Sequence, residues 1–232
     1  KLVKIGGNNT IALRVTTHPK GWEFDVNDDW SLSGIARNVT LFSLEPTHLK
    51  DLTIRTSLKE NQAIVAVNGL AERIAKVSAL GTIDVSGDLI DPRGKTVTSF
   101  KLKNVEFHGN ADSVTFNQQL VVSNPALWTA ESPNLYTLHL KIMNGNQLLQ
   151  SYTQRLGIRQ IDWSNGILKV NNRPIKLRGV DHHDLSPLNG RAITESELLA
   201  DVRLMQKANI NFIRTSHYPP NSRLSDICDS LG

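Results

Sequence analysis

Alternation of apolar and polar residues is the feature that most limits what this chain can fold into. In residues 52–58, Leu52, Ile54 and Leu58 share one side and the residues between them are polar, and residues 136–142 repeat the pattern. Residues 10–16 and 39–44 are short and rich in β-branched side chains. A period of two predicts strands with one buried face, so residues 1–157 are expected to be β.

Turn-forming residues separate these segments. Three runs stand out: Asn68-Gly69, Asp91-Pro92-Arg93-Gly94 and Asn144-Gly145-Asn146. Short strands joined by such turns are typical of a β-sandwich. We place this sandwich at residues 46–159. Residues 1–45 are expected to be the C-terminal part of a preceding β domain, and residues 160–232 form a third region.

The pattern changes in the third region, where strands begin to alternate with helices. Residues 166–172 and 174–180 are predicted strands, residues 210–214 are another, and a helix lies on either side of the last one. Strand, helix, strand, helix is the order of α/β folds with parallel strands. Two such units can neither close a sheet nor cover both of its faces, so we expect a truncated part of a larger α/β domain.

The first of these helices carries its own start signal and one apolar face. Thr194 followed by Glu197 is a capping box, so the helix is expected to begin there. Leu198, Val202 and Met205 follow at spacings of four and three residues and share one side. Because a truncated domain would leave this face uncovered, we expect it to dock on the sandwich or on another copy of the chain.

Charge and composition exclude several classes of function. Lysine and arginine number 26 and aspartate and glutamate 22, and the net charge of +4 is spread along the chain. No nucleic-acid or anionic-membrane partner is expected from that distribution, and no apolar run reaches the roughly 18–20 residues of a membrane span. The single cysteine, Cys228, allows no internal disulfide, and it fits the cytoplasm and the periplasm equally well.

Two polar clusters follow two consecutive predicted strands. They are Asp181-His182-His183-Asp184 and Arg214-Thr215-Ser216-His217-Tyr218-Pro219. Neighbouring residues of an extended chain point to opposite sides, so the first cluster offers at most two ligands to one point, which favours a polar loop over a metal site. Arginine can hold a carboxylate, and histidine can donate to a hydroxyl-rich ligand. Because barrels carry active sites at the C-terminal ends of their strands, the two clusters together favour a functional role.

Four elements spread along the chain carry a resemblance to a known family. They are residues 29–39 (DWSLSGIARNV), 125–136 (PALWTAESPNLY), 157–159 with 177–180 (GIR and LRGV) and 211–219 (NFIRTSHYP). In this order they resemble the motifs of glycoside hydrolase family 2, most closely its bacterial β-galactosidases. The resemblance implies that residues 160–232 are the N-terminal part of a (β/α)8 (TIM) barrel. The fold class is then mainly β: an immunoglobulin-like sandwich with flanking strands and a truncated barrel.

The resemblance also implies an activity and a set of site residues. Family members are retaining glycosidases in which two glutamates, about 5–5.5 Å apart, act as acid/base and nucleophile. Both lie later in the family's barrel, so this chain is expected to hold no catalytic residue and to be inactive alone. By motif, His183 and His217 would line the subsite for the β-glycoside substrate, Arg214 would support the pocket floor, and Asp28 would contact the sugar from the first domain.

Two alternatives stay open. Leu185 and Ser186 stand where the β-galactosidase pattern has further histidines, so a glucuronide or another β-glycoside is open as the substrate. The family's metal ligands also lie downstream, so neither a metal nor a cofactor is expected here. The second interpretation is a non-catalytic immunoglobulin-like carbohydrate-binding or adhesion module. The strand–helix–strand tail is evidence against it, because such modules end after their last strand.

Overall fold

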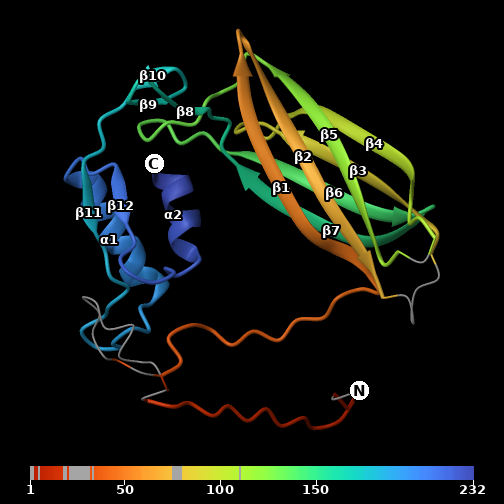
Figure 1. Cartoon of the computed structure of the whole chain (residues 1–232), viewed down its shortest axis with the longest axis horizontal. Coiled ribbons are helices and arrows are strands. Elements are labelled where there is room, and N and C mark those ends of the chain that lie inside the picture. The colour runs from red at the N-terminus through yellow and green to blue at the C-terminus, as the bar shows by residue number, and fades with distance from the viewer. Residues whose placement is uncertain are drawn as a thin grey trace.

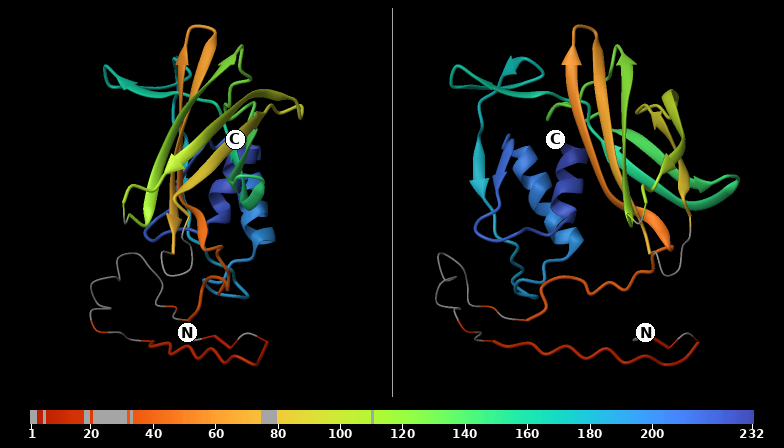
Figure 2. Two further views of the ribbon diagram at one scale, coloured as in Figure 1. Left: turned by 90° about the vertical axis from the view of Figure 1, so that its right-hand side faces the viewer. Right: turned by 45° about the vertical axis from the view of Figure 1, so that its right-hand side comes forward.

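Figure 1 shows a two-layer β-sandwich beside a smaller unit of strands and helices. The computed structural model describes residues 3–4, 6–17, 20, 32, 34–74, 80–109 and 111–232. Residues 6–17 and 34–45 run along one end of the molecule, and the second of these segments leads into the first strand (Figure 2).

In the described part of the chain, seven strands form the two antiparallel sheets of the sandwich. One sheet has the order β1–β2–β5 and the other the order β4–β3–β6–β7. The strands are β1 (Thr47–Lys59), β2 (Gln62–Arg73), β3 (Thr82–Ile90), β4 (Thr96–Glu106), β5 (Ser113–Ser123), β6 (Tyr136–Asn144) and β7 (Gln147–Leu156). This is the β-sandwich that the alternating pattern predicts, of the immunoglobulin-like type that the resemblance implies.

Alternate residues of the strands fill the space between the two sheets. Val65 and Val67 of β2 face Val85 and Leu89 of β3 across one continuous core, and all four are fully buried. In β6 the predicted inward residues are also buried: Tyr136, Leu138, Leu140 and Ile142. Full burial of a side chain of this size contributes about 1.5–3 kcal/mol, so the period of two stabilises the sandwich directly.

Asn68-Gly69 is predicted as a turn, and this prediction is wrong, because both residues lie in the middle of β2. Gly69 is opposite Phe116 of β5, and a Cβ at this position would come within 2.0 Å of the ring. The second sheet repeats the arrangement, with Gly87 opposite Phe100 and a Cβ 2.3 Å from that ring. In each sheet a glycine leaves the space that a cross-strand phenylalanine fills.

The other two predicted turns are confirmed. Between β3 and β4, Asp91 donates its backbone N–H to the carbonyl oxygen of Lys95 at 2.8 Å, and Gly94 donates to Asp91 at 2.9 Å. Gly145 and Asn146 join β6 to β7. Gly145 has a φ of +58°, the left-handed conformation in which a glycine meets no steric penalty.

The strands expected at residues 10–16 and 39–44 are not present. Both segments are described, and neither pairs with another strand among the described residues. Their apolar side chains, such as Ile11, Leu41 and Phe42, are exposed. A strand needs a neighbour that accepts and donates its backbone hydrogen bonds, so the local β propensity of these segments is insufficient on its own.

A small three-stranded sheet connects the sandwich to the βα unit. It contains β8 (Ile161–Ser164), β9 (Ile167–Val170) and β10 (Arg173–Pro174) in antiparallel order. The predicted strand at residues 174–180 is divided: β10 pairs with β9, and β11 (Gly179–Asp181) pairs with a different partner. The chain changes direction between these two pairings, which explains why one continuous strand does not form.

The βα unit has the predicted parallel pairing. β11 lies parallel to β12 (Phe212–Arg214), and α1 (Glu195–Lys207) connects them. Thr194 caps α1 as predicted: its hydroxyl accepts the N–H of Glu197 at 3.3 Å, and the carboxylate of Glu197 accepts the N–H of Thr194 at 2.8 Å. The fold is therefore a mainly β chain with a sandwich and a parallel strand–helix–strand unit.

The apolar face of α1 is covered by α2 (Arg223–Leu231). Leu198 and Val202 are buried against Leu224 and Ile227 of α2. The expectation that the sandwich or another copy of the chain covers this face is corrected by that contact. Neither helix has the length and apolar character of a membrane span in the part of the chain that the structure describes.

α2 in turn lies between α1 and the sandwich (Figure 2). The indole N–H of Trp128 donates to the carbonyl oxygen of Asp229 at 2.8 Å. Gly232, with a φ of +93°, sits so close to Ala130 that a Cβ would come within 1.9 Å of the Ala130 carbonyl oxygen. The two units therefore meet through backbone groups as well as through side chains.

The cross-strand glycine yields a stability prediction. Gly69→Ala is expected to lower the free energy of unfolding by about 1–3 kcal/mol, because the new methyl group overlaps the buried Phe116 ring. Gly81→Ala is the matched control, since a Cβ at Gly81 meets no atom within 4 Å. Urea unfolding measures both variants, and equal losses in the two would contradict the prediction.

Candidate functional site

The C-terminal ends of β11 and β12 bring the two polar clusters together. Asp181 is opposite Arg214 in the parallel register, and His182 extends the ladder by donating its backbone N–H to the carbonyl oxygen of Arg214 at 2.9 Å. The residues that follow the two strands therefore leave the same edge of the pair, as the sequence predicts.

His183 and His217 are neighbours at this edge. Their ring centroids are 6.1 Å apart and the ring planes are nearly perpendicular, at 82°. Tyr218 lies 5.8 Å from the His183 ring, and the guanidinium of Arg191 stacks over the Tyr218 ring at 4.2 Å. Each imidazole carries ring nitrogens that donate or accept hydrogen bonds. The arrangement offers hydrogen-bonding edges and aromatic faces to one region, which suits a ligand with hydroxyl groups.

Arg214 and Asp28 are the other two predicted site residues. The side chain of Arg214 makes an ion pair with Asp181 at 3.2 Å, and both side chains are more than half exposed. An exposed pair of this kind contributes little to stability, and the role of Arg214 at the pocket floor stays a prediction. Asp28 lies outside the residues that the structure describes.

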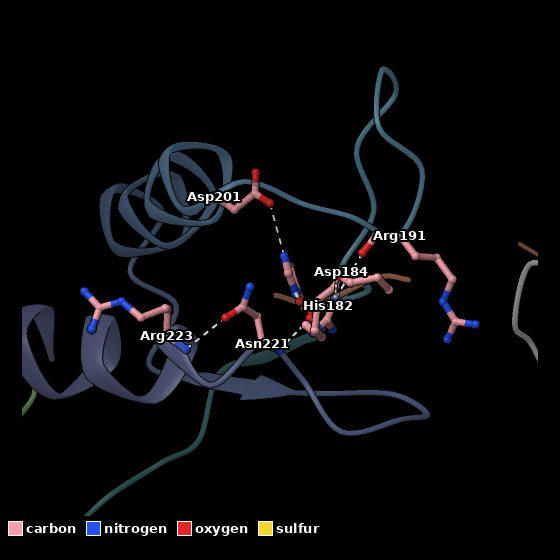
Figure 3. Close-up of polar contacts among 8 residues, drawn as sticks. His182, Asp184, Arg191, Asp201, Asn221 and Arg223 are labelled. Atoms are coloured by element: carbon pink, nitrogen blue, oxygen red, sulfur yellow. Dashed lines mark hydrogen bonds and ion pairs between the residues drawn. The ribbon is translucent and has the colours of Figure 1, made fainter. Parts of the chain in front are cut away.

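Asp184 is the best-connected polar side chain of the site, and the sequence predicts no individual role for it. It is only 2% exposed. One carboxylate oxygen accepts a guanidinium N–H of Arg37 at 2.5 Å. The same oxygen accepts the backbone N–H of Asn221 at 2.6 Å (Figure 3). Arg37 also donates to the carbonyl oxygen of Arg191 at 3.1 Å. A buried carboxylate needs such partners, because leaving it unpaired costs several kcal/mol.

His182 links this carboxylate to α1. Its ring is buried, and its Nε2 lies 3.1 Å from a carboxylate oxygen of Asp201 on α1. Its Nδ1 faces the second oxygen of Asp184 at 3.6 Å. Figure 3 shows the imidazole between the two carboxylates. The strand end, the helix and the segment around Arg37 are thus joined by charged and polar groups.

A second set of contacts holds the loop after β11 against the start of α1. The hydroxyl of Ser186 donates to Glu197 at 2.6 Å and accepts the backbone N–H of Asn189 at 3.2 Å. The hydrogen bond from Ser186, followed by those from Thr194, lowers the pKa of Glu197 below its ordinary value. Glu197 therefore works as a structural acceptor, as its capping role predicts.

The other glutamate of the first turn of α1 is also paired. Arg223 donates to Glu195 at 2.7 Å, and this contact lowers the pKa of Glu195. Arg223 contacts Asp226 as well. Within the described ranges, no three His, Cys, Asp or Glu side chains converge in a way that could hold a metal ion.

A cavity of about 580 Å³ opens beside the site. It is lined by residues 15–17, 32 and 34–37 from the N-terminal segment, and by residues 189–192 and 218–219. Such cavities between chain segments are common places for small ligands. The sequence alone does not predict this cavity, because its lining residues are far apart in the sequence.

Two family models match this chain. The model described as "Glycosyl hydrolases family 2" matches residues 47–159. The model described as "Glycosyl hydrolases family 2, TIM barrel domain" matches residues 161–232. Together they take in the sandwich and the βα unit.

Curated relatives are similar over nearly the whole chain. A β-galactosidase of Leuconostoc mesenteroides is 33% identical over 229 residues, which is 97% of this chain and 22% of the relative. A β-galactosidase of Halalkalibacterium halodurans is 32% identical over 98% of this chain and 22% of the relative. The chain thus spans about a fifth of the length of these relatives.

Solved structures share the fold. The crystal structure of the β-glucuronidase of Parabacteroides merdae superposes with a TM-score of 0.70 and 25% identity. The match covers 81% of this chain and 23% of that protein.

The paired glutamate yields a prediction on pH. The pKa of Glu197 is lower in the folded state than its ordinary value of 4.5, so ionised Glu197 stabilises the fold fully at pH values above 4.5. This contribution is lost as the pH falls through the lowered pKa. The wild-type urea midpoint is therefore expected to exceed that of Glu197→Gln at neutral pH, with a gap that narrows below pH 4.5.

The control for this measurement is Glu131→Gln, at an exposed position of the sandwich. It is expected to follow the wild type across the same pH range. A gap between wild type and Glu197→Gln that stays constant down to the lowest pH would show that ionisation of Glu197 does not contribute.

Proposed function

The chain belongs to glycosyl hydrolase family 2, and we propose that the full-length protein containing it hydrolyses terminal β-linked glycosides with retention of anomeric configuration. The observation that carries the proposal is the match of both family models in consecutive order over residues 47–159 and 161–232. The parallel β11–β12 pair with His183 and His217 at its C-terminal end agrees with it, because barrels bind substrate at that end.

The residues of this chain bind and orient the sugar in this proposal. His183 and His217 hydrogen-bond its hydroxyl groups, and the ring of Tyr218 borders the same region. The chemical step needs two carboxylates, one as acid/base and one as nucleophile, about 5–5.5 Å apart. In the described residues Glu195 and Glu197 are occupied by Arg223 and Ser186. We therefore place the catalytic pair in other parts of the full-length protein, as the family resemblance implies.

A β-galactoside is the substrate that we favour. The curated relatives named β-galactosidase are about 33% identical over nearly the whole chain, whereas the β-glucuronidase structure is 25% identical over a smaller share. Leu185 and Ser186 keep a β-glucuronide as the second candidate, because the further histidines of the galactosidase pattern are missing. A non-catalytic binding module is disfavoured, because it gives no reason for a parallel pair followed by α2.

A panel of aryl β-glycosides tests the function with the full-length protein. We expect turnover of the β-galactoside, with the β-anomer of the free sugar appearing first in proton NMR. Residues 1–232 alone are expected to release no aryl group. Turnover by residues 1–232 alone would contradict the assignment of both catalytic carboxylates to other parts of the protein, and inversion would contradict the retaining mechanism.

Substitution of the two histidines tests the binding role. His183→Ala and His217→Ala in the full-length protein are each expected to lower kcat/KM by roughly 5- to 150-fold, the effect of losing about 1–3 kcal/mol of hydrogen bonding. His139→Ala is the matched control, because His139 lies on the sandwich and contacts Thr153. Steady-state kinetics measures all three. Full activity in both site variants would remove these histidines from the sugar subsite.

A further inference from the structure

Arg37 reaches three separate parts of the strand-end region from a segment far away in the sequence. It donates to Asp184 just after β11 and to the carbonyl oxygen of Arg191 in the following loop. Asp184 also accepts the backbone N–H of Asn221, which lies between β12 and α2. One guanidinium therefore holds two points of the connection between β11 and α1 directly, and it holds the segment before α2 through the shared carboxylate of Asp184.

Both residues that Arg37 contacts, Asp184 and Arg191, are linked directly to a residue of the proposed sugar subsite. Asp184 follows His183 directly in the chain. Arg191 places its own guanidinium over the ring of Tyr218, and Tyr218 packs against the ring of His183. A displacement of Arg37 would thus act on His183 from two sides, through Asp184 and through the Arg191–Tyr218 stack.

The burial of the two partners explains why an arginine is needed. The Asp184 side chain is 2% exposed and the Arg37 side chain 33% exposed. The carboxylate is sealed from water, whereas its guanidinium partner remains accessible from one side. A guanidinium carries several N–H donors in a planar fork and can bind Asp184 and the Arg191 carbonyl oxygen together, which the single ammonium of lysine does poorly.

We propose that Arg37 is a positioning residue of the site: acting through Asp184 and the 189–192 loop, it holds His183 and Tyr218 in the geometry that receives the sugar. This inference rests on the proposed function. The hydrogen bonds of Arg37 go to Asp184 and to the carbonyl oxygen of Arg191, so its proposed effect on turnover is indirect. The segment that precedes the sandwich thereby completes a site formed by the barrel strands.

The test uses the full-length protein with Arg37→Ala and Arg37→Lys. Arg37→Ala is expected to lower kcat/KM for an aryl β-galactoside by roughly 10- to 100-fold, mostly through kcat, because small misplacements of binding groups are that costly. Low-millimolar guanidinium chloride is expected to raise the kcat/KM of Arg37→Ala at least tenfold, because the space vacated by the arginine side chain is open to solvent. Sodium chloride at equal ionic strength is expected to restore nothing.

Two further variants serve as controls for Arg37→Ala. Arg37→Lys is expected to be impaired without rescue by guanidinium, because its side chain fills the space. Asn38→Ala, at the exposed neighbouring position, is expected to keep wild-type kinetics. An Arg37→Ala variant that is within twofold of wild type would overturn the inference. So would a loss of activity that guanidinium does not restore, since that outcome indicates damage beyond the vacated guanidinium site.

Hydrogen exchange separates this inference from the proposed function. The backbone amides of the non-proline residues in 183–191, and those of Tyr218 and Asn221, are expected to exchange faster in Arg37→Ala than in wild type or Asn38→Ala, whatever the enzyme hydrolyses. If the wild type hydrolyses no glycoside, the proposed function fails, and faster exchange still supports the positioning of these loops by Arg37. Unchanged exchange of these amides in Arg37→Ala would overturn the positioning role of Arg37.

Discussion

The parallel pairing of β11 with β12 is the constraint on which the candidate site depends. Parallel strands end at the same edge, so the residues after Asp181 and Arg214 meet although 33 positions separate the two. An antiparallel pair would place these ends on opposite edges. Parallel strands also need a long crossover, and α1 supplies it. The burial of α1 against α2 stabilises the pair, because a three-residue parallel ladder has few hydrogen bonds of its own.

The parts of the fold that depend on neighbouring residues in the sequence could be predicted. The alternation in β6 predicts its buried face, and Thr194 predicts the start of α1. The errors concern features that distant residues decide. Gly69 resembles a turn residue until Phe116 is placed opposite it. Residues 39–44 have β propensity but no pairing strand among the residues that the structure describes. Local sequence contains no information about either partner.

The site, like the fold, has residues that the sequence predicts and residues that it does not. The sequence places His183 and His217 at the ends of consecutive parallel strands, and the structure brings their rings within 6.1 Å. The role of Asp184 could not be predicted, because Arg37 lies 147 residues away and Asn221 contributes only its backbone N–H. Backbone donors have no sequence signal, so a carboxylate that depends on them looks like an ordinary polar loop residue.

The contact between Gly232 and Ala130 has a consequence for the angle between the sandwich and the helices. Backbone atoms that touch directly have no rotamers with which to adapt, and no other amino acid type fits at the glycine. The sandwich therefore fixes the position of the C-terminal end of α2. A tilt of the sandwich against α2 would require a shift of the main chain itself.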